Sequence, residues 1–140
     1  MIRKRRSGFT IIEIMTVIII ISLIAVFMAP KLFKGLGKAK RDITRARMAN
    51  IENAIGRFSL DCGRLPTDSE GLEALIEPPA GLEDQWNGMY LKRSELLDAW
   101  KNPIEYQAEG TINIGHYDLI SFGADGQPGG EGDNADIYND

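Results

Sequence analysis

The sequence has very little cysteine or histidine: Cys62 and His116 are the single examples of each in 140 residues. A lone cysteine excludes an intramolecular disulfide. A cysteine nucleophile would need a neighbouring base, whereas Cys62 continues an apolar helical stripe and is expected to be a buried structural thiol. No motif in the chain pairs a nucleophile with a base. The sequence therefore argues against an enzyme, including a membrane-anchored one.

Basic residues are outnumbered by acidic ones, 16 to 20, which gives a formal net charge of −4. Four of the basic residues lie in the first six positions: Arg3, Lys4, Arg5 and Arg6. Without residues 1–8 the chain would keep 12 basic and 20 acidic side chains, a net charge of −8. Such an acidic chain argues against nucleic acid as a partner.

One long apolar segment, residues 9–29, is interrupted only by Thr10, Glu13, Thr16 and Ser22. At about 1.5 Å per residue, a helix of this length crosses a bilayer core of roughly 30 Å. Isoleucine and valine dominate the segment and would favour a strand in water. A single strand is not viable in lipid, because every backbone group must be satisfied internally. The segment is therefore predicted to be one membrane-spanning helix.

This segment has two ordinary explanations, a cleaved signal peptide and a plain membrane anchor. The apolar core of a signal peptide is usually about 7–15 residues long, and no A-x-A-like cleavage site follows residue 29. A plain anchor remains open, with Glu13 lying near the membrane interface. An ionisable side chain inside such a segment costs up to about 2.5–3.5 kcal/mol at its centre, so Glu13 is predicted to be functional. Because basic residues flank both ends of the segment, the positive-inside rule does not fix its orientation in the membrane.

The basic segment ending at Gly8, followed by Phe9-Thr-Ile-Ile-Glu13, resembles the N-terminal signature of type IV pilins and type II secretion pseudopilins. The resemblance implies that a prepilin peptidase cuts between Gly8 and Phe9 and methylates the new amine of Phe9. It implies that Glu13 pairs with the terminal amine of a neighbouring subunit. Residues 1–8 would be a cytoplasmic leader, 9–30 a transmembrane and assembly helix in the bacterial inner membrane, and 31–140 a periplasmic domain.

After the apolar segment, Pro30 is expected to end or bend the helix, and Gly35 and Gly37 to weaken it. The family resemblance implies instead one long helix, with this region open to local unwinding. The basic patch that follows is expected to be a solvated face near lipid headgroups. It consists of Lys31, Lys34, Lys38, Lys40, Arg41, Arg45 and Arg47. From Ala39 to about Asp61, an amphipathic helix is predicted to stop at Gly63. Its apolar face carries Met48, Ile51, Ala54, Ile55, Phe58 and Cys62.

The rest of the sequence predicts a short helix and short β-strands joined by irregular segments. Thr67-x-x-Glu70 is a capping-box sequence that would open a short helix, ended by Pro78-Pro79. Residues 80–98 are expected to be irregular, with an edge strand starting at Tyr90 and Leu91. Residues 104–107 and 117–122 are predicted to form antiparallel strands. The predicted fold class is α+β: a long N-terminal helix packed on a small antiparallel sheet, followed by a loop-rich tail.

Two later segments narrow the resemblance to the major pseudopilins of type II secretion. Residues 63–76 resemble the family pattern G-R-[YL]-P-T…E-G-L-x-A-L, and residues 98–106 its D-P-W element, with Ala99 in place of proline. The resemblance implies a homopolymer, the pseudopilus, which drives export across the outer membrane with minor pseudopilins and an inner-membrane platform. The alternative, a type IV pilin of a surface fibre, is disfavoured by the missing disulfide.

The tail concentrates acidic residues, five of them between Asp125 and Asp140 without a basic partner. Their mutual repulsion favours either solvent or a hard cation with oxygen ligands, and composition leaves a flexible acidic tail equally open. An EF-hand is excluded, because Gly129 occupies a ligand position and no helices flank the loop. Residues 123–137 resemble the calcium loop of major pseudopilins. The resemblance implies that Ca²⁺ is held by the carboxylates of Asp125, Asp133 and Asp136 and by the carbonyls of Phe122 and Gln127.

Overall fold

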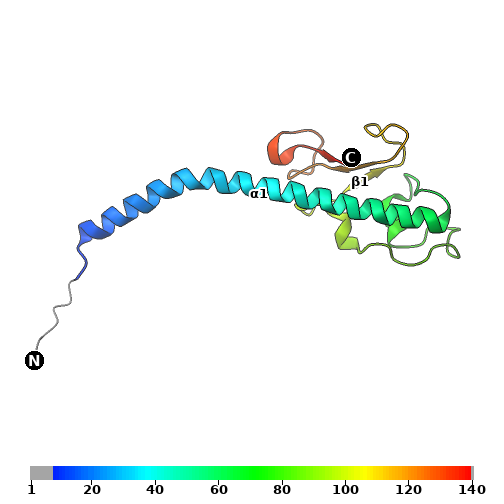
Figure 1. Cartoon of the computed structure of the whole chain (residues 1–140), viewed down its shortest axis with the longest axis horizontal. Coiled ribbons are helices and arrows are strands. Elements are labelled where there is room, and N and C mark those ends of the chain that lie inside the picture. Colours follow the sequence, from blue (N-terminus) through cyan, green and yellow to red (C-terminus); the bar gives the residue numbers. More distant parts are fainter. Residues whose placement is uncertain (1–7, 140) are drawn as a thin grey trace, which may run out of the picture. The chain divides into compact units, whose positions relative to one another are not determined.

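The computed structural model describes residues 8–139 and divides the chain into two units, one ending at Leu36 and one beginning at Gly37. Helix α1, Ile11–Cys62, belongs to both (Figure 1). Of the two outcomes expected at Pro30, an end of the helix is wrong, because residues 30–37 are all helical. The single long helix implied by the family resemblance is confirmed, and the predicted unwinding near Gly35 and Gly37 is not seen.

In the N-terminal unit, α1 leaves the large apolar side chains from Ile11 to Met28 uncovered. Ile11 is 82% exposed, Ile18 57% and Val26 70%. By length and composition, α1 is the one helix among the described residues able to cross a membrane. Its internal hydroxyls are satisfied within the helix: Thr16 donates to the carbonyl of Ile12 at 2.8 Å and Ser22 to that of Ile18 at 2.7 Å. Such a helix leaves no side-chain hydroxyl without a partner in lipid.

In the C-terminal unit, one face of α1 forms the centre of the hydrophobic core. The predicted stripe is confirmed, since its five apolar residues before Cys62 are all buried: Met48, Ile51, Ala54, Ile55 and Phe58. They pack against side chains from later segments, including Leu75, Leu119 and Ile137. Cys62 is half-buried and packs at the edge of this core. Gly63, with a φ of +72°, ends the helix as predicted.

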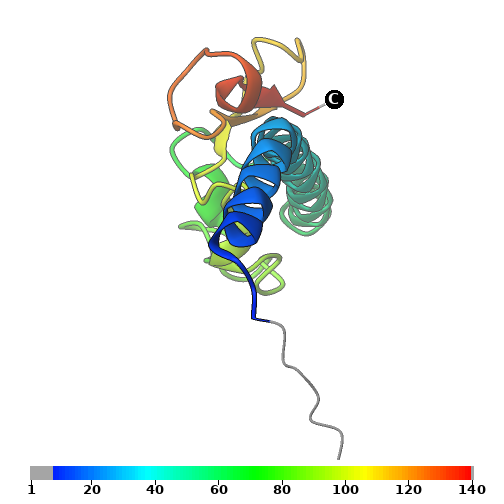
Figure 2. The same cartoon turned by 90° about the vertical axis from the view of Figure 1, so that its left-hand side faces the viewer.

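The sheet has three antiparallel strands in the order β1-β2-β3: Glu105–Gln107, Asp118–Ser121 and Ile137–Tyr138. Tyr106 pairs with Leu119, and Ser121 with Ile137. All four residues of β2 are buried. Figures 1 and 2 draw the sheet on one side of this half of α1. The predicted α+β class and the first two strands are confirmed; β3 was not predicted, because its two residues lie within the acidic tail.

The segment between α1 and the sheet is built from turns and two 3-10 helices, η1 (Gly71–Leu75) and η2 (Arg93–Leu96). Half of the predicted capping box is present: Glu70 accepts the amide of Thr67 at 2.9 Å, but the Thr67 hydroxyl contacts Ser69. The predicted edge strand at Tyr90 is wrong. Tyr90 instead packs its ring edgewise on Phe58, with the centroids 5.9 Å apart.

Three arginines of α1 donate hydrogen bonds to backbone carbonyls of separate loops. Their acceptors are Gly132 and Ala135 for Arg41, Leu97 and Asp98 for Arg47, and Tyr90 for Arg57. The shortest is the 2.6 Å bond from Arg47 to the Leu97 carbonyl. The expectation of a purely solvated basic face is therefore wrong for Arg41 and Arg47. These loop carbonyls, which have no hydrogen-bond partner in the sheet, accept hydrogen bonds from arginine side chains of α1.

Two buried carboxylates hold the turns that enter and leave the sheet. Asp98 accepts the amides of Trp100 and Asn102, both at 2.9 Å, and the hydroxyl of Ser121 at 2.7 Å. Asp118 is fully buried and accepts three consecutive amides of the loop before β2, at 2.6–2.9 Å. Burial by itself would raise the pKa of Asp118, but these amides outweigh it and hold the pKa below its ordinary value.

Replacing Asp118 tests this anchoring. Asp118→Ala should lower the free energy of unfolding of the detergent-solubilised chain by about 3 kcal/mol, because three amides lose their shared acceptor. Urea denaturation measures the change. Because the folded pKa is depressed, the advantage of the wild type over Asp118→Asn should be complete above about pH 4 and disappear as the pH falls further. The exposed Glu109 provides the control, and equal stability of Asp118→Ala and Glu109→Ala would contradict the assignment.

Candidate assembly and metal-binding sites

The N-terminal site consists of the residues just before α1 and its first turn. Gly8 and Phe9 precede the helix and are exposed, Phe9 by 77%. The amide of Glu13 donates to the Thr10 carbonyl at 3.1 Å and to the Thr10 hydroxyl at 3.3 Å, so Thr10 caps the helix. The Gly8–Phe9 bond therefore lies in accessible, non-helical backbone, while Glu13 is fixed in the first turn.

The cap at Thr10 was missed by the sequence reasoning. Its available signal was the spacing Thr10-x-x-Glu13, which has the form of a capping box. A carboxylate in the first turn is also favoured by the helix dipole. Capping of the helix therefore explains the presence of Thr10, and the helix dipole explains part of the preference for Glu13. Neither effect provides a positively charged partner for the Glu13 carboxylate, which is exposed in this chain.

The second site is the C-terminal loop, residues 122–136, which connects β2 to β3 and contains the 3-10 helix η3, Gly132–Asn134. The loop closes on itself: the amide of Ala124 donates to the Asp133 carbonyl at 2.9 Å. Gly123 has a φ of +66°, and a Cβ there would lie 2.6 Å from the same carbonyl oxygen. A side chain at Gly123 would therefore force the loop open.

The predicted carboxylate ligands lie on this loop in different environments. Asp125 is exposed and accepts the amide of Gln127 at 3.2 Å. Asp136 is half-buried, and both its oxygens lie 3.0 Å from the amide of Gly129. Asp133 is exposed, with its carboxylate against α1 where a Cβ at Gly37 would overlap it. Phe122 is half-buried directly after β2.

The three carboxylates share a loop but do not converge. Over residues 8–139, no three acidic, histidine or cysteine side chains gather closely enough to form a metal cluster. The donor set nevertheless fits a hard cation, because residues 122–139 offer carboxylate and carbonyl oxygens and contain no basic residue. The tight approach of Gly123 to Asp133 also shows that the loop backbone closes on itself. The residues therefore fit Ca²⁺ in the chemistry of their donor atoms, while the three carboxylates are not gathered into one cluster.

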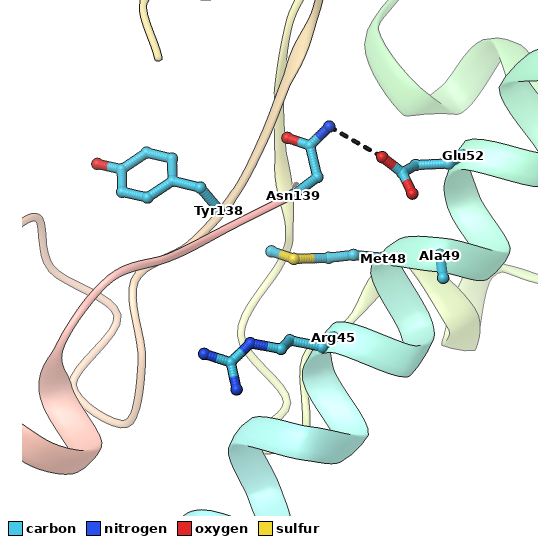
Figure 3. A pocket seen from close by; sticks show the side chains of 6 residues that line it. All are labelled: Arg45, Met48, Ala49, Glu52, Tyr138 and Asn139. Carbon is cyan, nitrogen blue, oxygen red and sulfur yellow. Dashed lines mark hydrogen bonds between the residues drawn. The ribbon is translucent and has the colours of Figure 1, made fainter. Parts of the chain in front are cut away.

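Both ends of the loop are anchored to the rest of the C-terminal unit. At its start, the side-chain amide of Asn102 donates to the Gly123 carbonyl at 2.8 Å. Beyond β3, the side-chain amide of Asn139 donates to Glu52 on α1 at 3.0 Å (Figure 3). The Asn139 side-chain oxygen also accepts the amide of Leu119 at 2.7 Å. A cavity of about 90 Å³ lies between α1 and the chain end, beside Arg45 and Met48. Ligand sites usually have about 300–1,000 Å³, so this cavity is small for one.

Known protein families match the segments that contain both sites. Residues 31–140 match the family model described as type II secretion system (T2SS), protein G, and residues 3–29 match the prokaryotic N-terminal methylation motif. The chain is 39% identical to the type II secretion system core protein G of Pseudomonas aeruginosa, over 98% of this chain and 96% of that protein. It is 37% identical to that of Vibrio cholerae, over 97% and 92%.

The fold is also similar to a solved structure, described as the crystal structure of the major pseudopilin from the type 2 secretion system of enterohaemorrhagic Escherichia coli. The TM-score is 0.62 at 27% sequence identity, over 79% of this chain and 94% of that one. The protein G family is structural and not enzymatic, in agreement with the missing nucleophile–base motif. Sequence and fold therefore place this chain in the type II secretion system protein G family, as a major pseudopilin with an N-terminal methylation motif.

Proposed function

We propose that this pseudopilin is held in the bacterial inner membrane by residues 9–30, with residues 31–140 in the periplasm, and polymerises into a pseudopilus that drives protein export across the outer membrane. The observation that carries the proposal is the uncovered apolar surface of α1 before Pro30, with a carboxylate in its first turn. Lipid covers such a surface in the free subunit, and neighbouring helices cover it in a filament. Minor pseudopilins and the inner-membrane platform are the further partners that this role requires.

Maturation is proposed to occur at the Gly8–Phe9 bond, followed by N-methylation of Phe9. The support is the accessible, non-helical backbone at these residues, next to a helix that begins only at Ile11. Residues 1–7 of the proposed leader lie outside the described part of the chain. A prepilin peptidase that reads a small residue before the scissile bond would accept Gly8 and reject a bulky side chain.

Gly8→Leu tests the cleavage site. The variant should stay at the mass of the full chain when expressed with a prepilin peptidase, whereas the wild type loses residues 1–8 and gains a methyl group. Intact mass spectrometry of the membrane fraction measures this. Ser7→Leu, one residue earlier, is the control and should be processed more readily than Gly8→Leu. Full maturation of Gly8→Leu would disprove the proposed site.

Glu13 is proposed to pair with the charged amine of Phe9 in a neighbouring subunit. The support is its position: a carboxylate fixed in the first turn of a helix that is otherwise apolar to Ala29 apart from hydroxyl side chains. Opposite charges about 4 Å apart attract by about 4 kcal/mol at an effective dielectric constant near 20, before desolvation is subtracted. In lipid, each charge lowers the cost of burying the other.

Glu13→Ala should leave the subunit processed and inserted but reduce fibre yield at least tenfold, because the amine loses its partner. Sheared fibres and the membrane fraction are quantified by immunoblotting. The control is Thr16→Ala, since the Thr16 hydroxyl already bonds within its own helix and should not be needed for assembly. A wild-type yield of fibres from Glu13→Ala would remove the pairing role.

We also propose that Asp125, Asp133 and Asp136, with the carbonyls of Phe122 and Gln127, bind Ca²⁺. The proposal is supported by the oxygen-only donor set and the closed loop described above. A bound Ca²⁺ would supply positive charge to carboxylates that otherwise repel one another. It would also offset the conformational entropy of a loop rich in glycine, whose backbone is costly to order.

Calcium should raise the melting temperature of the detergent-solubilised chain. The linkage relation gives about 2.7 kcal/mol when free Ca²⁺ exceeds its dissociation constant a hundredfold. Mg²⁺ should substitute poorly, because it requires a stricter octahedral geometry. Thermal unfolding is compared in Ca²⁺, Mg²⁺ and chelator for the wild type, for Asp125→Ala and for Glu131→Ala, an acidic control in the same loop. The same melting temperature for the wild type in Ca²⁺ and in chelator would eliminate the metal site.

A further inference from the structure

Arg41 connects α1 to the middle of the C-terminal loop. Its Nη1 donates to the carbonyl of Gly132 at 3.0 Å and to that of Ala135 at 3.1 Å. These carbonyls flank Asp133 and directly precede Asp136 in the chain. One guanidinium nitrogen therefore holds the backbone next to Asp133 and Asp136, two of the three proposed carboxylate ligands.

Gly37 contributes to the same contact from one helical turn earlier. Residues i and i+4 lie on one face of a helix, so Gly37 and Arg41 face the loop together. A Cβ at Gly37 would overlap the Asp133 carboxylate, so with any other residue here this side chain would have to move away from the helix. Gly37 leaves space for the Asp133 side chain, and Arg41 binds the backbone on either side of Asp133.

The acceptors of Arg41 are carbonyls. Among residues 8–139, no ion pair joins Arg41 to Asp133 or Asp136. A guanidinium that paired with these carboxylates would compete with a metal ion for them. By binding carbonyls, Arg41 orders the loop while it leaves the carboxylate charge available to a divalent cation.

We infer that Arg41, admitted by Gly37, is the positioning residue of the C-terminal loop: it fixes Asp133 and Asp136 before the cation binds. The inference rests on the proposed function for its calcium readout. It makes a separate statement about the metal-free loop, which should be ordered by Arg41 whether or not calcium is present. A pre-ordered loop binds its ligand more tightly, because less conformational entropy is lost on binding.

The test uses the full chain in detergent micelles. Titration calorimetry gives the Ca²⁺ dissociation constant, and hydrogen exchange in chelator gives the protection of the Ala124 and Gly129 amides. Arg41→Ala should weaken Ca²⁺ binding about tenfold and speed exchange at both amides, because two charge-assisted hydrogen bonds are lost. Arg41→Lys, which keeps a donor, should recover part of both effects. Arg45→Ala, an exposed arginine one turn further along α1, is the matched control and should change neither.

Gly37→Ala is a second variant that keeps Arg41 and the helix. Alanine favours a helix more than glycine does, so general destabilisation is not expected from it, yet its Cβ should displace Asp133 and weaken Ca²⁺ binding. Unchanged exchange and unchanged Ca²⁺ affinity in Arg41→Ala or in Gly37→Ala would overturn the inference. A wild type that binds no Ca²⁺ but loses amide protection in Arg41→Ala would reject the calcium site and keep Arg41 as the residue that orders the loop.

Discussion

The C-terminal unit depends on the capacity of one helix to satisfy loops that have little regular structure of their own. Its strands have two to four residues, so most loop carbonyls cannot find partners in the sheet. Unpaired carbonyls would oppose burial of the apolar face of α1. Arg41, Arg47 and Arg57 remove that opposition, and the apolar stripe from Met48 to Phe58 can then be covered.

The acidic composition of the chain has a structural use at two positions and a proposed ligand role at others. Asp98 and Asp118 are buried and accept backbone amides, and Asp98 also accepts a hydroxyl, so both carboxylates hold turns in place. Asp125 and Asp133 are exposed at the loop surface. Burial therefore distinguishes Asp98 and Asp118, which hold turns, from Asp125 and Asp133, which remain available to solvent or to a cation.

The sequence predicted what depends on local periodicity and length, and missed what depends on distant partners. The apolar run is long enough to cross a bilayer and the stripe of α1 repeats at helical spacing, so the positions of both followed from the local sequence. Strand β3 and the bonds of Arg41 join residues far apart in the chain and have no local pattern. At the candidate sites, resemblance supplied the residues Glu13 and Asp125, but neither resemblance nor spacing indicated that Gly37 would face Asp133.

The lone, half-buried Cys62 has a consequence for how the C-terminal loop moves. The loop is held by hydrogen bonds donated by the side chains of Arg41, Asn102 and Asn139 instead of a covalent cross-link. Uncatalysed disulfide rearrangement takes minutes to hours, whereas hydrogen-bonded loops reorganise in nanoseconds to microseconds. A subunit of this kind reaches its final shape without an oxidation step, and its loop closes again after each opening without the help of an oxidoreductase.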